Sequence, residues 1–175
     1  MRIRSDLRRA CDKAKENLTI ERSYDFTEAH MALTREFIER VEMHPRIREL
    51  FLRMPHYVGP ATHSLILNAR DRDRNLTAFY IVDLATKDFS TYVIGCHSKR
   101  TYTAEASDLL VSEMIDLSLE YDKDYIHLGL GVNRGIRQFK KKWGGIPALR
   151  YEMCELTFKK PSLFDVIKTL SHNYR

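Results

Sequence analysis

The chain has 175 residues, of which 43% are hydrophobic and 30% are charged. This length suits one domain whose core needs neither disulfides nor metals, and the composition excludes a largely disordered chain. The formal net charge is +5, from 29 Lys and Arg against 24 Asp and Glu. No apolar run reaches the roughly 18 residues of a membrane span, and the first residues lack the apolar stretch of a secretory signal. We expect a soluble, cytoplasmic protein that does not bind a membrane.

The positive charge is concentrated in two segments. Residues 1–22 carry +3, residues 131–160 carry +6, and the remainder carries −4. A basic segment on a mildly acidic body predicts a local anion site. Lysine-rich exposed helices that serve solubility alone would give the same distribution.

The three cysteines are widely spaced in the sequence, at Cys11, Cys96 and Cys154. No CxxC motif and no Cys/His cluster with zinc spacing is present, so we predict no metal site. Free thiols in a reducing cytoplasm are the expected state of the three side chains.

Residues 1–22 are predicted to form a charged N-terminal helix or extension that packs on the body or on a partner. A helix from the Asp25/Glu28 capping box should run to about Met43. A second helix should begin at Pro45 and stop at Pro55 and Gly59-Pro60. No linker divides the rest of the chain, so we expect residues 23–175 to form a single domain.

The hydrophobic period then changes from about 3.6 to 2, which indicates strands. Three strands joined by short polar turns, near residues 65–69, 76–83 and 90–96, predict an antiparallel meander. Further elements follow in the order helix, strand, helix, strand, helix, at residues 106–121, 125–130, 133–143, 151–158 and 164–170. We therefore expect an α/β (α+β) fold with a mixed, mostly antiparallel sheet and helices on both faces.

Two stretches that follow the helix predicted at residues 106–121 carry a family resemblance. The strand Tyr-Ile-His-Leu-Gly at 125–129 precedes a Gly-rich turn, and Phe-Lys-Lys-Lys-Trp-Gly-Gly follows at 139–145. Together with the element order, these residues resemble the GNAT N-acyltransferases, and more closely their FemAB-like branch, which includes peptidoglycan-bridge aminoacyltransferases. The resemblance implies an N-acyltransferase that moves an acyl or aminoacyl group from acyl-CoA or aminoacyl-tRNA to an amine-bearing acceptor.

The resemblance also implies roles for individual residues. Main-chain N–H groups at Ile94, Gly95 and Cys96 would bind the acyl carbonyl, and Lys140 would hold negative charge developing on the acyl oxygen. The anionic donor, a CoA phosphate or a tRNA end, would be bound by residues near two helix N-termini. These residues are Lys99, Arg100, Asn133, Arg134 and Arg137. Lys141, Lys142, Lys159 and Lys160 are expected to be solubilising, whereas Phe139 and Trp143 are expected in the core.

The sequence also departs from the family. The stretch that usually carries the Gly-rich, CoA-binding loop is here His97–Ala104, without a glycine. This departure favours the FemAB-like branch and weakens the case for acetyl-CoA. His127 stands where the branch has an acidic or amide residue; it is either a general base or a buried core histidine.

Three alternatives remain from the sequence. A degenerate GNAT-like module could bind RNA or an anionic metabolite without catalysis. The charged N-terminal helix could make the chain an interaction subunit. Related enzymes are often built from two such domains, so a homodimer could complete the site.

Overall fold

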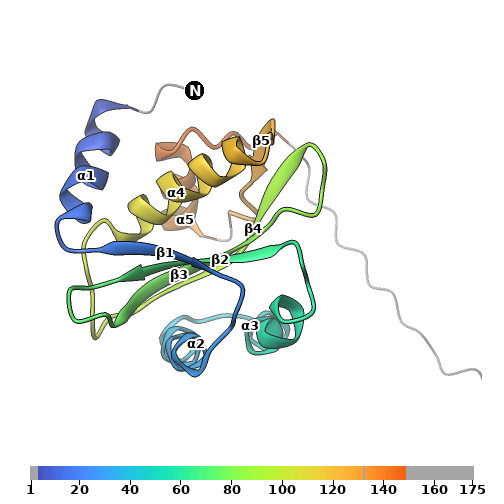
Figure 1. Ribbon diagram of the computed structural model, residues 1–175. Helices are drawn as coiled ribbons and strands as arrows, with labels where there is room; N and C mark the ends of the chain where they lie inside the picture. Colours follow the sequence, from blue (N-terminus) through green and yellow to red (C-terminus); the bar gives the residue numbers. More distant parts are fainter. Residues whose placement is uncertain (1–3, 132, 149–175) are drawn as a thin grey trace, which may run out of the picture.

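The structure, a computed structural model, describes residues 4–131 and 133–148. The helices and strands follow one another in nearly the predicted order (Figure 1). The helices are α1 (Ser5–Lys15), α2 (Glu28–Arg40), α3 (Pro45–Val58), α4 (Ala106–Glu120) and α5 (Arg134–Lys142). The strands are β1 (Thr19–Ser23), β2 (Ser64–Arg70), β3 (Leu76–Asp83), β4 (Phe89–His97) and β5 (Tyr125–His127).

The five strands form one sheet in the order β1-β2-β3-β4-β5. Strands β1 to β4 are antiparallel neighbours, and β5 pairs with β4 in parallel. Helices α2 and α3 cover one face, while α1 and α4 cover the other with α5 beside them (Figure 1). The predicted mixed sheet with helices on both faces is confirmed.

Each face of the sheet has its own hydrophobic core. Alternate residues of β3 serve the two cores: Tyr80 and Val82 pack toward α1 and α4, whereas Phe79 and Ile81 pack toward α2 and α3. Because both faces are covered, the central strands are buried almost throughout rather than at every second residue. Neither of these strands has a face that is exposed along its length, and Thr77 near the start of β3 lines the cavity described below.

The N-terminal segment differs from its prediction. Helix α1 ends at Lys15, and Thr19–Ser23 forms an edge strand paired with β2, which the sequence analysis missed. The predicted boundary between residues 22 and 23 falls inside this strand. With Ile20 as its one apolar residue, the strand Thr-Ile-Glu-Arg-Ser carries no period-2 signal.

The ends of three other elements differ in part from the prediction. Thr27, not Asp25, caps α2, and its partner in the capping box is His30. Helix α3 ends at Val58 with Gly59 as its C-cap, so Gly59-Pro60 stops it as predicted, whereas Pro55 lies inside the helix and does not stop it. Strand β5 ends at His127, three residues earlier than expected.

Several predictions fall outside the described residues. They are the strand at 151–158, the helix at 164–170, Cys154, Lys159 and Lys160. Cys11 and Cys96 are buried free thiols. None of the described helices combines the length and apolar character needed to cross a bilayer.

Candidate active site

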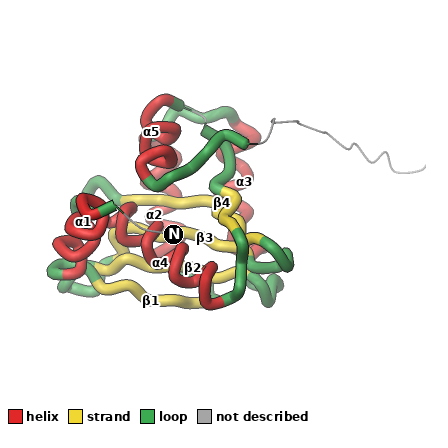
Figure 2. Tube along the Cα trace, turned by 90° about the horizontal axis from the view of Figure 1, so that it is seen from above, coloured by secondary structure: helices red, strands yellow, loops and turns green. Residues whose placement is uncertain are grey.

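Strands β4 and β5 separate after a short parallel contact. Their pairing ends at Thr91 and His127, and β4 continues to His97. A β-bulge interrupts the pairing with β3, where Val82 faces Tyr92 and Ile81 faces Ile94, leaving Val93 unpaired. The edge of β4 from Tyr92 onward therefore has no strand beside it among the described residues, and α5 stands near it (Figure 2).

Lys140 of α5 reaches into this opening. Its Nζ donates to the carbonyl oxygens of Leu128 and, at 2.6 Å, Leu130, and lies 5.8 Å from the centre of the Tyr92 ring. Burial lowers the pKa of the Lys140 ammonium. The side chain thus ties the segment after β5 to β4, with its charge in the opening between the strands.

Two tyrosine rings cover Gly95 on the same face of β4. The rings of Tyr80 and Tyr92 pack edge-to-face at 4.9 Å. A Cβ on Gly95 would lie 2.4 Å from the Tyr92 hydroxyl oxygen and 2.6 Å from Tyr80 ring carbons. Glycine is required here by this close approach, and burial raises the pKa of both phenols.

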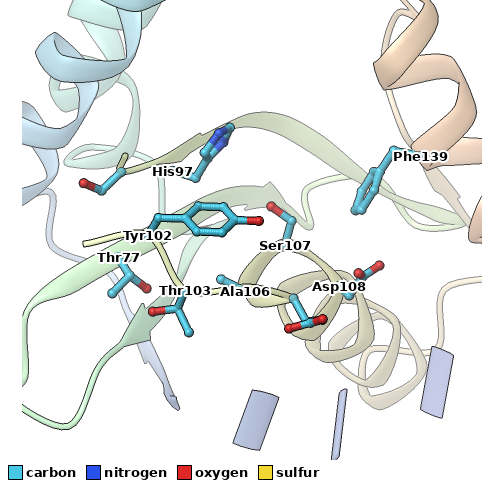
Figure 3. A pocket seen from close by; sticks show the side chains of 10 residues that line it. Thr77, His97, Tyr102, Thr103, Ala106, Ser107, Asp108 and Phe139 are labelled. Atoms are coloured by element: carbon cyan, nitrogen blue, oxygen red, sulfur yellow. The ribbon is translucent and has the colours of Figure 1, made fainter. Parts of the chain in front are cut away.

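A cavity of about 240 Å³ lies at the far end of β4 (Figure 3). His97 and Ser98 border it on the β4 side, Phe139 on the α5 side, and the first turn of α4 closes it. The remaining lining residues are Thr77, Tyr102, Thr103, Glu105, Ala106, Ser107 and Asp108. Hydroxyl groups and two carboxylates dominate this lining, so the cavity suits a polar ligand.

Glu105, directly before α4, has a backbone φ of 63°. This left-handed conformation is uncommon for a residue with a side chain. The Glu105 carboxylate lines the cavity at this point.

The second carboxylate, Asp108, joins α4 to α5. It accepts from Trp143 Nε1 at 2.6 Å and from Lys142 Nζ at 2.8 Å. Trp143 is buried, as predicted. Lys142 was expected to be only solubilising, and this prediction is wrong, because its ammonium pairs with a buried carboxylate of the neighbouring helix.

The turn between β4 and α4 is held by Glu36 of α2. The Glu36 carboxylate accepts from the Lys99 backbone N–H at 2.7 Å and from the Ser98 hydroxyl at 3.0 Å. The side chains of Lys99 and Arg100 are exposed on this turn.

None of the predicted site residues lines the cavity. Ile94 and Cys96 direct their side chains into the core beneath α2 and α3, and burial raises the pKa of Cys96 to about 12. His127 is exposed near Phe89, with 6.5 Å between ring centres, so the buried-histidine alternative is wrong. Its strand partner Thr91 lies about 20 Å along β4 from the cavity, at ~3.3 Å per residue.

Helix α5 begins as predicted. The Asn133 side chain accepts from Ile136 N at 2.9 Å, which confirms the N-cap. Arg134 and Arg137 are exposed on its first two turns, and Arg137 donates to the Gly131 carbonyl at 3.1 Å. Lys140 is the one predicted residue that the structure brings into the opening between β4 and β5.

Sequence reasoning missed Glu36, Tyr92 and the pairing of Asp108. Glu36 and Asp108 each sit on an amphipathic helix among other charges, and no sequence signal separates them from solvent-facing carboxylates. Within residues 4–131 and 133–148, no three His, Cys, Asp or Glu side chains gather in a way that could hold a metal ion.

Solved structures share this architecture at low sequence identity. AAC(6')-Iy, in complex with the bisubstrate analog CoA-S-monomethyl-acetylneamine, matches with a TM-score of 0.61 and 11% identity, over 81% of this chain and 99% of its own. Ribosomal-protein-alanine N-acetyltransferase from Brucella melitensis biovar Abortus 2308 matches with a TM-score of 0.58 and 13% identity, over 79% of this chain and 99% of its own. The chain has the GNAT fold.

A third similar structure is larger than this chain. L-PGS from Bacillus licheniformis matches with a TM-score of 0.58 and 13% identity, over 83% of this chain and 52% of its own. No protein-family model matches the sequence, and no curated protein matches it. The GNAT assignment therefore describes the fold, and the FemAB-like branch stays a prediction.

Proposed function

We propose that the chain is an N-acyltransferase. A primary amine attacks the carbonyl of an activated acyl group, the new amide bond forms, the donor thiol or alcohol leaves, and the amine gives up a proton. One observation carries the proposal: in a GNAT fold, the edge of β4 that no described strand pairs with runs from the Lys140 charge to a polar cavity at the start of α4.

The exposed backbone of β4 supports a place for the acyl carbonyl. Successive N–H groups of a strand point to opposite edges. One edge of Ile94–Cys96 is occupied by β3, and no strand within residues 4–131 and 133–148 pairs with the other edge, so its N–H groups would be available to a ligand. Lys140 would stabilise negative charge on the same carbonyl oxygen, because its charge is partly shielded from water.

The donor is an acyl-CoA thioester or an aminoacyl-tRNA ester. Exposed Lys99 and Arg100 on one side, and Arg134 and Arg137 on α5, would contact its phosphates. Asn133 supports this role by fixing the start of α5. The acceptor carries a primary amine, and a second subunit would complete the site in a homodimer. His127, exposed beside Phe89 and paired with Thr91, lies away from this part of β4 and has no role in the proposed step.

Replacing Lys140 by alanine tests the proposal. Transfer from radiolabelled acetyl-CoA and from aminoacyl-tRNA to a panel of amines should fall about 100-fold in kcat, because a charge acting on the acyl oxygen is lost. The matched control is Lys141→Ala, an exposed neighbour on α5 that should keep full turnover. Unchanged turnover in a folded Lys140→Ala protein would remove Lys140 from the mechanism.

A second candidate is a non-catalytic module that binds RNA or an anionic metabolite. It is favoured by the turn between β4 and α4, whose N–H groups are already bonded within the chain. Thermal-shift measurements with CoA, acyl-CoA and tRNA at two salt concentrations separate the candidates. RNA binding with a steep salt dependence and no acyl transfer from any donor would favour the module.

A further inference from the structure

The turn between β4 and α4 contains a small anion-binding nest that the chain fills itself. The backbone N–H of Lys99 donates to Glu36 Oε1 at 2.7 Å. The Ser98 hydroxyl bonds to both Glu36 oxygens at 3.1 and 3.0 Å. The same hydroxyl accepts from the N–H groups of Arg100 and Thr101 at 3.0 and 3.1 Å. Three successive N–H groups thus converge, directly or through Ser98, on one carboxylate.

Two features show that this arrangement is part of the packed structure. The Ser98 side chain is buried, and Glu36 crosses from α2 on the other side of β4 to reach the turn. Burial alone would raise the pKa of Glu36, but the bonds from the Lys99 N–H and the Ser98 hydroxyl outweigh it, so the pKa is lowered. The nest therefore favours a charged anion.

The surroundings of the nest are cationic. Arg40, one turn beyond Glu36 on α2, donates to the His97 carbonyl at 2.9 Å. Its Nε is the one buried side-chain nitrogen or oxygen without a hydrogen-bond partner among the described residues. Lys99 and Arg100 add two exposed cations at the turn itself. Without Glu36, its carboxylate would no longer accept from these N–H groups or balance the nearby positive charges.

We propose that Glu36 is a specificity-determining residue that keeps phosphate groups off the backbone N–H groups of this turn. A carboxylate and a phosphate accept from the same N–H groups and repel each other, so the nest holds one or the other. The inference rests on the proposed function, since both donor classes carry phosphates. It means that the donor's phosphates do not bind the backbone N–H groups of the turn and instead contact exposed cationic side chains, such as those of Lys99 and Arg100.

Replacing Glu36 by alanine should turn the nest into a phosphate site. We expect inorganic diphosphate to raise the Tm of Glu36→Ala by at least about 3 °C at matched ionic strength, and CoA to act likewise. The wild type and the control Glu39→Ala, on an exposed residue of the same helix, should shift by less than about 1 °C. Glu36→Ser, which also removes the carboxylate and shortens the side chain, replaces the alanine variant if that variant does not fold.

Equal shifts in the wild type and the Glu36 variants would overturn the proposal, as would a folded variant without any shift. The readout is ligand binding in the absence of an acceptor. A protein that transfers no acyl group would therefore still give either result, and failure of the enzyme proposal stays distinguishable from failure of this one.

Discussion

The buried His30 side chain links the start of α2 to two strands. It is 1% exposed, its Nδ1 accepts from the Thr27 N–H at 3.0 Å, and its Nε2 lies 2.6 Å from Asn68 Oδ1. The Asn68 amide donates onward to Ser23 Oγ at 3.0 Å. Because Nδ1 is an acceptor, the network fixes the neutral tautomer with its proton on Nε2.

A neutral buried histidine makes stability depend on pH. Burial lowers the pKa of His30 below its usual value of about 6.5. The folded state then resists protonation, so its stability is full above pH ~6.5 and declines as the pH falls toward the folded pKa, by up to about 1.4 kcal/mol per pH unit. Urea unfolding between pH 7.5 and 5 should show a steeper decline for the wild type than for His30→Gln.

His56→Gln provides the control, since His56 is exposed on α3. It should follow the wild-type curve. Parallel curves for the wild type and His30→Gln would contradict the assignment of the neutral tautomer as the source of the pH dependence.

At the scale of elements, the residue that follows α5 is buried, whereas the residues along the helix are not. Helix α5 has no buried residue within Arg134–Lys142, and Trp143, which follows it, is buried and bonded to Asp108 of α4. The contact of Trp143 and Lys142 with Asp108 therefore helps to place Lys140 and Phe139 beside β4, together with the packing of Phe139 on the core and the bonds from Lys140 to the Leu128 and Leu130 carbonyls.

Asp108→Ala should loosen α5. Losing an acceptor for both Lys142 and the indole N–H should lower the free energy of unfolding by about 1–3 kcal/mol. Trp143 is the sole tryptophan of the chain, so its emission maximum should move to longer wavelength as α5 exposes it. Asp116→Ala, at an exposed position on α4, should change neither quantity. An unchanged emission maximum in Asp108→Ala would show that α5 docks without this contact.

At the scale of the whole molecule, the N-terminal segment belongs to the main core. Leu7, Cys11, Ala14 and Leu18 are buried together with residues of β2, β3 and α4, and β1 extends the sheet. Deleting residues 1–22 would remove α1 and most of β1. Such a deletion therefore tests folding, and a change in oligomeric mass after it would not by itself identify an interaction helix.

Leu7→Ala should destabilise the whole protein by about 2–5 kcal/mol, because it leaves a cavity in the shared core. Arg8→Ala, at the next and exposed position of α1, should stay within about 0.5 kcal/mol of the wild type. Denaturant unfolding followed by circular dichroism measures both. A Leu7 variant as stable as the wild type would place α1 outside the cooperative unit.

Local sequence was enough for the elements whose signals are local. Periodicity and capping chemistry predict the meander strand at 76–83, the helix from Ala106 and the Asn133 cap. The structure confirms all three. The edge strand β1 was missed, because an exposed strand carries little hydrophobic pattern and forms only by pairing with β2. The element order and the 125–145 motif were also sufficient to predict the GNAT fold.

The site depended on contacts between residues far apart in the sequence. Glu36 accepts a hydrogen bond from Lys99, 63 positions away in the sequence, and Asp108 accepts one from Trp143, 35 positions away. Such pairs leave no periodic signal, since each partner is an ordinary charged or aromatic residue on its own helix. The sequence by itself determined the fold class and the basic segment. Only the tertiary structure decided that Lys140 enters the opening beside β4 and that the neighbouring turn already holds a carboxylate. Both features depend on how separate helices pack against one strand.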